Sequence, residues 1–243
     1  MLRLVPKPIR RMARRYIDKR GFVLASEVEV NLHKVMRRRK LPQVRTVIDV
    51  GASDGRWSRE MMQYYPAARY LLIEAQTAAH GEELRRFKAE HGNVICEMCA
   101  AGNQKGQINF FANEPLGGQA SAQPYAENNI VVPMETVDDL VRKHDLVGPF
   151  LLKLDTHGFE VPIFEGAHET LPQSSMLIVE AYNFALCPGC LRFYELCPYL
   201  EARGFRCLDV FDLLVRPHDH VFWQMDMVFV PSSDPLFEYQ EFR

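Results

Sequence analysis

Three ionisable side chains near the ends of two apolar segments could activate a nucleophile. Asp155 ends the run Phe150–Asp155, His157 follows two residues later, and Glu180 lies near the end of Met176–Ala181. If both runs are parallel strands of one sheet, these groups meet beyond its carboxyl edge, where such sheets bind ligands. His157 or Asp155 could then act as a general base.

These side chains also have other interpretations. A second catalytic hypothesis is that Asp155 and Glu180 hold a divalent metal ion as a pair. A purely structural interpretation is that Asp155 caps the following turn. His157 is as readily an ordinary loop histidine. Lys153, within the same apolar run, could pair with a carboxylate such as Glu180 or Asp226 and serve only the fold.

A glycine turn supplies a second candidate site. The segment Thr46–Gly55 reads TVIDVGASDG, and Gly51 and Gly55 flank a tight turn into a helical stretch. Glycine lets the backbone approach a ligand closely. Glu74 ends the next apolar run about 20 residues after the turn, where an acid can accept the two hydroxyls of a ribose. The combination predicts a cofactor that contains adenosine.

The details of the turn favour S-adenosylmethionine over a dinucleotide. The turn lacks the G-x-G-x-x-G spacing, and Asp49 and Asp54 would repel a pyrophosphate but suit a cationic methionine group. The same turn fits the G-x-S-x-G nucleophile elbow of hydrolases, but that elbow needs earlier strands and only a basic helical segment precedes it. The predicted cofactor-binding residues are Asp49, Gly51, Ser53, Gly55, Glu74, Ala101, Gly102 and Asp155.

The elements that must position these residues alternate from residue 44 onward. Apolar runs that look buried are Thr46–Val50, Tyr70–Glu74, Val94–Ala100, Phe150–Asp155 and Met176–Ala181, and helical stretches cover about 56–65, 77–90, 136–144 and 160–170. This alternation predicts an α/β fold with a parallel sheet and helices on both faces.

The remaining segments are less regular. Gly106 to Asn113 could add a strand, and 113–129 has no clear period and predicts a lid or binding loop. A helix near 192–203 precedes Phe205–Val215 and Val221–Val230, which predict an antiparallel hairpin.

The first forty residues differ from the rest in charge. They hold thirteen Lys and Arg against three acids, and apolar residues within Ile9–Ile17 and Val28–Met36 fall on helical faces. Ser26 and Glu29 form a capping-box pattern before the second helix. We predict a basic helical extension over 1–43 and a catalytic domain over 44–243. The extension could form a homodimer contact, touch a membrane surface or an acidic partner, or present a solvated face.

Composition limits the classes of function. The 243 residues are 47% apolar, enough for a sizeable core, and residues beyond 40 hold sixteen Lys and Arg against twenty-eight acids. An acidic body does not favour nucleic acid as a partner. No run of about 18 apolar residues predicts a transmembrane helix. A secretory signal is not predicted, an Arg-rich mitochondrial leader stays open, and a reducing cytoplasm is expected.

The six cysteines do not suggest a disulfide framework. Cys96 and Cys99 are three positions apart in a predicted strand and would face opposite sides. Cys187 and Cys190 flank a Pro-Gly turn that could bring both sulfurs to a zinc ion. Cys197, Cys207, His218 or His220 would then have to complete the site. The simpler interpretation is a tight loop beside the substrate pocket.

Four blocks of sequence together resemble the FkbM family of methyltransferases over residues 44–231. They are Val47–Gly55 with Trp57 and Ser58; Ala100-Ala101-Gly102 with Gly106 and Phe110; Glu135–Leu140 running on to Leu152–Glu160 and Phe164–Ala167; and Met225–Val230. The third block is the most specific. One departure is Glu74-Ala75-Gln76, where many members have Glu-Pro.

The resemblance implies a class I methyltransferase fold, a Rossmann-like sheet of seven strands with an antiparallel last strand. It also implies methyl transfer from S-adenosylmethionine to oxygen, on a sugar, polyketide or other secondary metabolite. We therefore expect O-methylation of a small hydroxylated molecule or glycan, with an acceptor pocket shaped by 113–129 and 182–191. Rival hypotheses are a nicotinamide-dependent enzyme, a non-catalytic cofactor-binding partner module, and a methylase of protein or nucleic acid.

Overall fold

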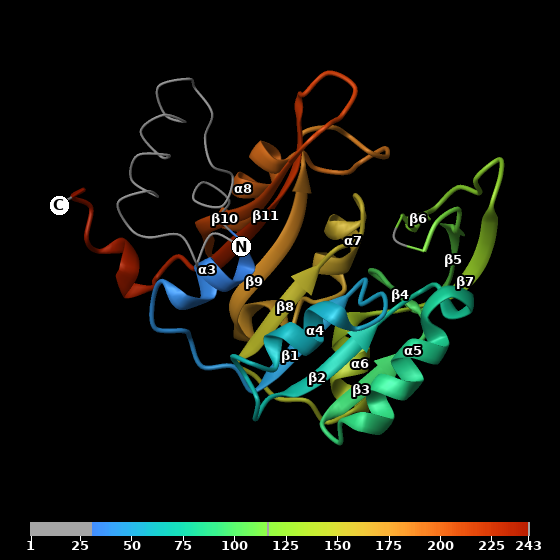
Figure 1. The fold of residues 1–243 in the computed structure, drawn as a ribbon, viewed down its shortest axis with the longest axis horizontal. Helices are drawn as coiled ribbons and strands as arrows, with labels where there is room; N and C mark the ends of the chain where they lie inside the picture. Colours follow the sequence, from blue (N-terminus) through green and yellow to red (C-terminus); the bar gives the residue numbers. More distant parts are fainter. Residues whose placement is uncertain (1–30, 116, 243) are drawn as a thin grey trace, which may run out of the picture.

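A seven-stranded sheet forms the centre of the computed structural model, which describes residues 31–115 and 117–242 (Figure 1). The strand order is β10-β11-β9-β8-β1-β2-β3. The strands are β1 (Thr46–Val50), β2 (Arg69–Ile73), β3 (Val94–Glu97), β8 (Phe150–Leu154), β9 (Ser174–Tyr182), β10 (Phe205–Val215) and β11 (Phe222–Pro231). Neighbours from β9 to β3 pair in parallel, and β11 is antiparallel to both β9 and β10. The predicted open sheet with an antiparallel terminal hairpin is confirmed.

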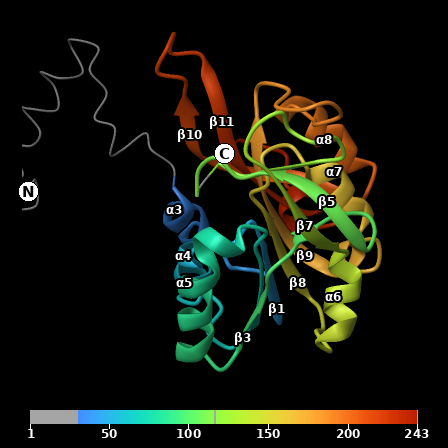
Figure 2. The ribbon, with the colours of Figure 1, turned by 90° about the vertical axis from the view of Figure 1, so that its right-hand side faces the viewer.

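Helices cover both faces of this sheet (Figure 2). On one face lie α3 (Leu32–Arg37), α4 (Arg56–Met61) and α5 (Thr77–Glu90), and on the other lie α6 (Val137–Lys143), α7 (Glu160–Glu165) and α8 (Phe193–Glu201). Short 3-10 helices occupy Leu171–Gln173 and Pro235–Phe237. Because both faces are covered, β1 and β8 are buried at every position and are apolar except at Thr46, Asp49 and Lys153.

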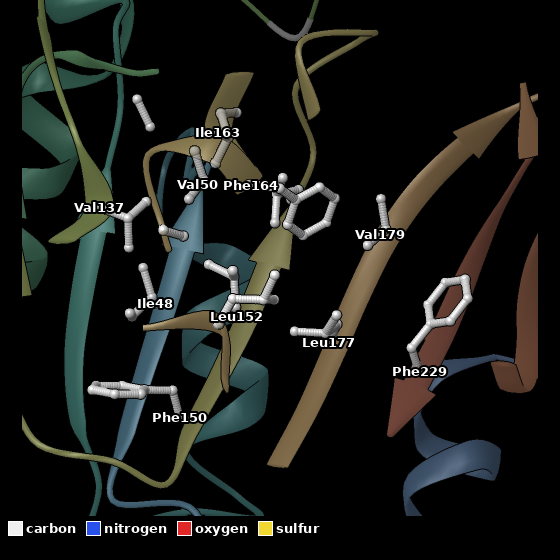
Figure 3. Close-up of a cluster of buried hydrophobic side chains, with 14 of the residues drawn as sticks. Ile48, Val50, Val137, Phe150, Leu152, Ile163, Phe164, Leu177, Val179 and Phe229 are labelled. Atoms are coloured by element: carbon white, nitrogen blue, oxygen red, sulfur yellow. The ribbon is translucent and has the colours of Figure 1, made fainter. Parts of the chain in front are cut away.

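Alternate residues of each strand pack into different layers. Ile48, Leu152 and Leu177 belong to the cluster beneath α6, α7 and α8, which Figure 3 shows with Phe229 of β11. Val47 and Leu151 point to the opposite cluster with α3, α4 and α5. Because successive side chains of a strand point to opposite faces of the sheet, a residue's position in the strand sets which helix layer its side chain can reach.

A second sheet was not predicted from the sequence. It has four strands in the order β4-β7-β5-β6, namely β4 (Ala100–Ala101), β7 (Asn129–Glu135), β5 (Gly106–Phe111) and β6 (Gln119–Ser121). The predicted run Val94–Ala100 was therefore wrong as one strand, because β3 ends at Glu97 and Ala100 begins β4 in the other sheet. The segment 113–129, predicted as a loop, contains β6 and reaches the first residue of β7.

Two predicted helices are shorter than expected. The helix predicted over 56–65 ends at Met61, and the one predicted over 160–170 ends at Glu165, where Gly166 caps it. Helix α6 matches its prediction closely, because the Thr136 side chain accepts a hydrogen bond from Asp139 N at 3.0 Å and fixes its start.

The N-terminal predictions are only partly covered by the structure. Helix α3 belongs to the second predicted helix, and its N-cap is Asn31, whose side chain accepts from Lys34 N. The first predicted helix, the Ser26 and Glu29 capping box and most of the suggested dimer contact lie outside the described residues. No helix among residues 31–115 and 117–242 is long and apolar enough to cross a membrane.

Candidate active site

A cavity of about 600 Å³ opens at the carboxyl ends of the central strands. Its walls come from the β1–α4 turn, the ends of β2, β8 and β9, and the second sheet, including its strand β4. Seven of the predicted site residues line it: Gly51, Ser53, Glu74, Ala101, Asp155, His157 and Glu180. Strand order explains this meeting, because β2, β1, β8 and β9 are adjacent in one sheet.

Asp49, Gly55 and Gly102 do not line the cavity. Gly55 has φ +81 at the start of α4, where a Cβ would lie 2.7 Å from the Phe87 ring. Gly102 packs against Met134 and Phe159. These glycines let neighbouring elements pack closely, and their contact with a cofactor stays a prediction.

Gly51 shapes the turn between β1 and α4. Its φ is +77, and a Cβ there would lie 2.0 Å from the carbonyl oxygen of Asp155. Its N–H donates to Ile73 O at 2.9 Å. Glycine at this position therefore allows the turn to contact the ends of β2 and β8 at once.

Glu74 ties the turn to the end of β2. Its side chain accepts from Ser53 N at 2.7 Å through Oε2 and from Gln76 N at 2.8 Å through Oε1. Only 6% of the residue is exposed, yet it lines the cavity. A carboxylate has about four acceptor sites, so two remain for ligand hydroxyls.

The segment after β5 covers this end of the cavity. Gln76 Nε2 donates to the carbonyls of Glu114 and Pro115, and His80 Nε2 lies 2.7 Å from Pro115 O. Pro115 and Gly118 line the cavity together with Phe110 and Ala120 of the second sheet. The predicted binding loop therefore borders the cavity, and part of it is held by side chains from the start of α5 and the residue before it.

Lys153 lines the cavity and carries a largely buried positive charge. Its Nζ lies 2.9 Å from Asp155 Oδ2, 3.4 Å from Asp49 Oδ1 and 5.3 Å from the centre of the Trp57 ring. Burial disfavours the ammonium, but the carboxylates of Asp155 and Asp49 outweigh it and raise the Lys153 pKa. The suggested partners Glu180 and Asp226 were therefore wrong as its ion-pair partners.

Asp49 is buried next to the cavity and does not line it. It is fully buried, and its Oδ2 accepts from Ser58 Oγ at 2.7 Å while its Oδ1 faces Lys153. The carboxylate is therefore bound by α4 and β8.

Asp155, His157 and Glu180 form a cluster at the other end of the cavity, hereafter the acid–histidine cluster. His157 Nε2 lies 3.9 Å from Asp155 Oδ1 and 3.7 Å from Glu180 Oε2. One potential ligand atom from each side chain lies within 4.8 Å of the other two. His157 has φ +53, and its Nδ1 lies 2.9 Å from Gly118 O.

The two carboxyl groups of the cluster differ in the direction of their pKa shifts. Burial and the nearby Asp155 raise the pKa of Glu180 to about 9. Burial alone would raise the pKa of Asp155 as well, but Lys153 lowers it below its usual value. Asp155 therefore favours the ionised form more strongly than Glu180 does.

Tyr182 and Gln224 are site residues that the sequence did not reveal. The Tyr182 hydroxyl donates to Glu180 Oε2, and Gln224 Nε2 donates to Glu180 Oε1. Gln224 reaches the site because β11 pairs antiparallel with β9 in a register that sets it opposite Tyr182. A polar residue within an apolar strand was the available signal, but the register is not readable from the sequence.

The Cys187–Cys190 loop packs against the turn that carries His157. Cys187 Sγ lies 3.3 Å from Gly158 O, and Cys187 N lies 3.3 Å from Cys190 Sγ. Within the described parts of the chain, the acid–histidine cluster is the one group of three or more metal-binding side chains, so the alternative zinc site is not assembled there. Cys96 and Cys99 contact opposite layers, as predicted.

The strand order and helix layers define a class I methyltransferase fold. The family model described as methyltransferase FkbM domain matches residues 49–207, and the chain belongs to this family. No curated protein matches it in sequence. Methyltransferase FkbM from Methylobacillus flagellatus KT superposes with a TM-score of 0.51 at 15% identity, covering 78% of this chain and 45% of that one. M. capricolum TrmK in complex with S-adenosyl-homocysteine superposes with a TM-score of 0.47 at 7% identity. The superposition covers 84% of this chain and 69% of that one.

Proposed function

We propose that this chain transfers a methyl group from S-adenosylmethionine to a hydroxyl of a small molecule, sugar or glycan. The supporting observation is a single cavity that is lined both by Glu74 and the glycine turn and by the acid–histidine cluster. Family membership supports methyl transfer, and the predicted hydroxyl acceptor comes from the family resemblance.

The residues at the Glu74 end fit the proposed cofactor. Glu74 keeps acceptor sites for ribose hydroxyls, and Ala101, Phe110 and Pro115 offer apolar surface for a base. When bound, S-adenosylmethionine supplies a methyl group on a positively charged sulfur. The ionised Asp155 places negative charge in the same cavity, which suits a cationic ligand.

The cluster end suits an acceptor that must lose a proton. An alcohol is a weak nucleophile until its proton is withdrawn, and His157 and Asp155 are the candidate bases. Lys153 holds Asp155 through its Oδ2, so the other carboxylate oxygen faces His157. The acidic body makes nucleic acid an unfavourable acceptor, because phosphate binding needs basic surface.

Labelling tests the proposed reaction. The full-length chain would be incubated with donor carrying an isotopically labelled methyl group and a panel of sugars, alcohols and cell extract, followed by mass spectrometry. We expect one labelled methyl ether among the products. Donor binding without transfer to any acceptor would favour a non-catalytic module, and tight NAD binding without donor binding would overturn the proposal.

Replacing the cluster histidine separates chemistry from cofactor binding. His157→Ala should reduce methyl transfer by at least about 100-fold, the usual contribution of a positioned acid–base group. Its affinity for S-adenosylhomocysteine should stay near that of the wild type, because the ribose site lies at the Glu74 end. Full activity in this variant would remove His157 from the reaction.

A further inference from the structure

We propose that Asp155, His157 and Glu180 bind a divalent cation of the Mn²⁺ or Mg²⁺ type, which binds the acceptor oxygen. This proposal rests on the proposed function for its role in catalysis, but the cation site itself is argued from geometry alone. The three side chains come from the end of β8, the turn after it and the end of β9.

The spacing of His157 from the two carboxyl groups suits a cation better than a direct hydrogen bond. His157 Nε2 lies 3.7 Å from Glu180 Oε2 and 3.9 Å from Asp155 Oδ1, both beyond hydrogen-bond reach. Two atoms bound to one ion at about 2.1 Å lie between about 3 Å and about 4.2 Å apart. Both distances fall inside that range.

The orientation of His157 directs a lone pair into the cluster. A carbonyl oxygen can only accept, so the contact of Nδ1 with Gly118 O at 2.9 Å places the ring proton on Nδ1. In the neutral ring, Nε2 then faces the two carboxyl groups with its lone pair. Metal-binding histidines characteristically donate their other ring N–H to a backbone carbonyl or carboxylate in this way.

Supporting contacts also orient both carboxyl groups. Lys153 donates to Asp155 Oδ2, which leaves Oδ1 facing His157. Tyr182 donates to Glu180 Oε2, the oxygen near His157, and Gln224 donates to Oε1. Each carboxylate oxygen has two acceptor sites, so Glu180 Oε2 can bind a cation while it keeps its bond from Tyr182.

The donor set selects the class of ion. Two carboxylates and one imidazole suit Mn²⁺ and Mg²⁺ better than a soft metal, and three protein ligands leave coordination positions open toward the cavity. An acceptor hydroxyl at an open position becomes more acidic. Its proton passes to water while its oxygen bonds the methyl carbon; the sulfur–methyl bond breaks and sulfur keeps the electron pair. On this proposal the bound cation makes the hydroxyl more acidic, so His157 serves as its ligand in place of the general-base role considered under the proposed function.

Manganese binding tests the site without measuring activity. Mn²⁺ would be titrated into chelator-treated full-length chain, with free ion followed by electron paramagnetic resonance. We expect about one ion per chain, and at least tenfold weaker binding in His157→Ala and Glu180→Gln. Tyr182→Phe, which removes a bond to Glu180, should weaken binding about 10-fold or more. His168→Ala and Glu201→Gln are matched controls, because both residues are exposed, and they should bind like the wild type.

The same preparations separate the two proposals. Affinity for S-adenosylhomocysteine, measured by calorimetry, reports whether each variant is folded and whether the proposed cofactor site exists. If the wild type binds the nucleoside but no Mn²⁺ below about 1 mM, or if His157→Ala and Glu180→Gln bind Mn²⁺ as tightly as the wild type, the cation site is wrong while the proposed function stands. If Mn²⁺ binds as expected and the nucleoside does not, the cation site stands and the proposed function fails.

Discussion

Individual side chains at the cavity divide into those that face a ligand and those that hold them. Glu74, Lys153 and His157 line the cavity, whereas Asp49 is fully buried and pairs with Lys153. The sequence predicted Asp49 as a cofactor residue because its negative charge would suit the cationic methionine group of S-adenosylmethionine. Strand parity sends its side chain to the α4 layer, where Ser58 binds it.

Glu74 gives the sharpest test of the cofactor site. Glu74→Gln keeps the shape of the side chain but replaces one acceptor oxygen with a donor, which would face a backbone N–H of Ser53 or Gln76. We expect affinity for S-adenosylhomocysteine to fall at least about tenfold, or about 1.4 kcal/mol. Calorimetric titration measures this directly, and unchanged affinity would place the ribose elsewhere.

Elements of the main sheet were predictable because their signals are local. Apolar runs of about five residues followed by helical periods predicted β1, β2, β8 and β9. Strand β7 was missed, because Pro133 interrupts it and Ile130 and Val131 are exposed on a half-covered sheet. Its pairing with β5 and β4 depends on contacts distant in sequence, which local patterns do not report.

The β1–α4 turn predicts a position-specific loss of stability. Gly51→Ala forces a Cβ against the Asp155 carbonyl at φ +77, so the free energy of unfolding should fall by about 3 kcal/mol or more. Gly204→Ala is the matched control, because Gly204 has φ +83 but open space around it, and should cost only about 1–2 kcal/mol. Urea denaturation compares the two, and equal losses would contradict the close packing.

The contact of β3 with α6 predicts a pH-dependent contribution to stability. Burial alone would raise the Glu97 pKa, but hydrogen bonds from Lys143 and His144 outweigh it and lower the pKa. A carboxyl whose pKa is lower in the folded state than in the unfolded state stabilises the fold at a pH above its unfolded-state pKa of about 4.3. This stabilisation is lost as the pH falls through the folded-state pKa. At pH 6 the free energy of unfolding of the wild type should exceed that of Glu97→Gln by about 1 kcal/mol or less. This difference in unfolding free energy should shrink toward pH 3; a constant difference would exclude the ion pair.

The molecule as a whole combines an acidic three-layer body with a basic start of the chain. The fold class followed from the alternation of strands and helices, and the family from four short blocks. The chemistry of the site was less predictable. Asp155 and His157 are near neighbours in sequence, but Gln224 joins them only through the pairing of β11 with β9. Sequence patterns thus predicted the site residues at the strand ends, but not the residues of neighbouring strands that contact them.

Ligand binding should stabilise the whole fold. At a concentration of S-adenosylhomocysteine about 100 times its Kd, the free energy of unfolding should rise by about 2.7 kcal/mol. For a chain of this size we expect the Tm to increase by about 5–10 °C. NAD at the same concentration should leave the Tm unchanged. A shift with NAD alone would favour a nicotinamide-dependent enzyme.

The most direct test is a crystal structure of the full-length chain with S-adenosylhomocysteine. We predict ribose hydroxyls against Glu74, with the sulfur directed toward Asp155, His157 and Glu180. A nucleoside bound outside this cavity, or a Glu74 side chain turned away from the ribose, would contradict the account.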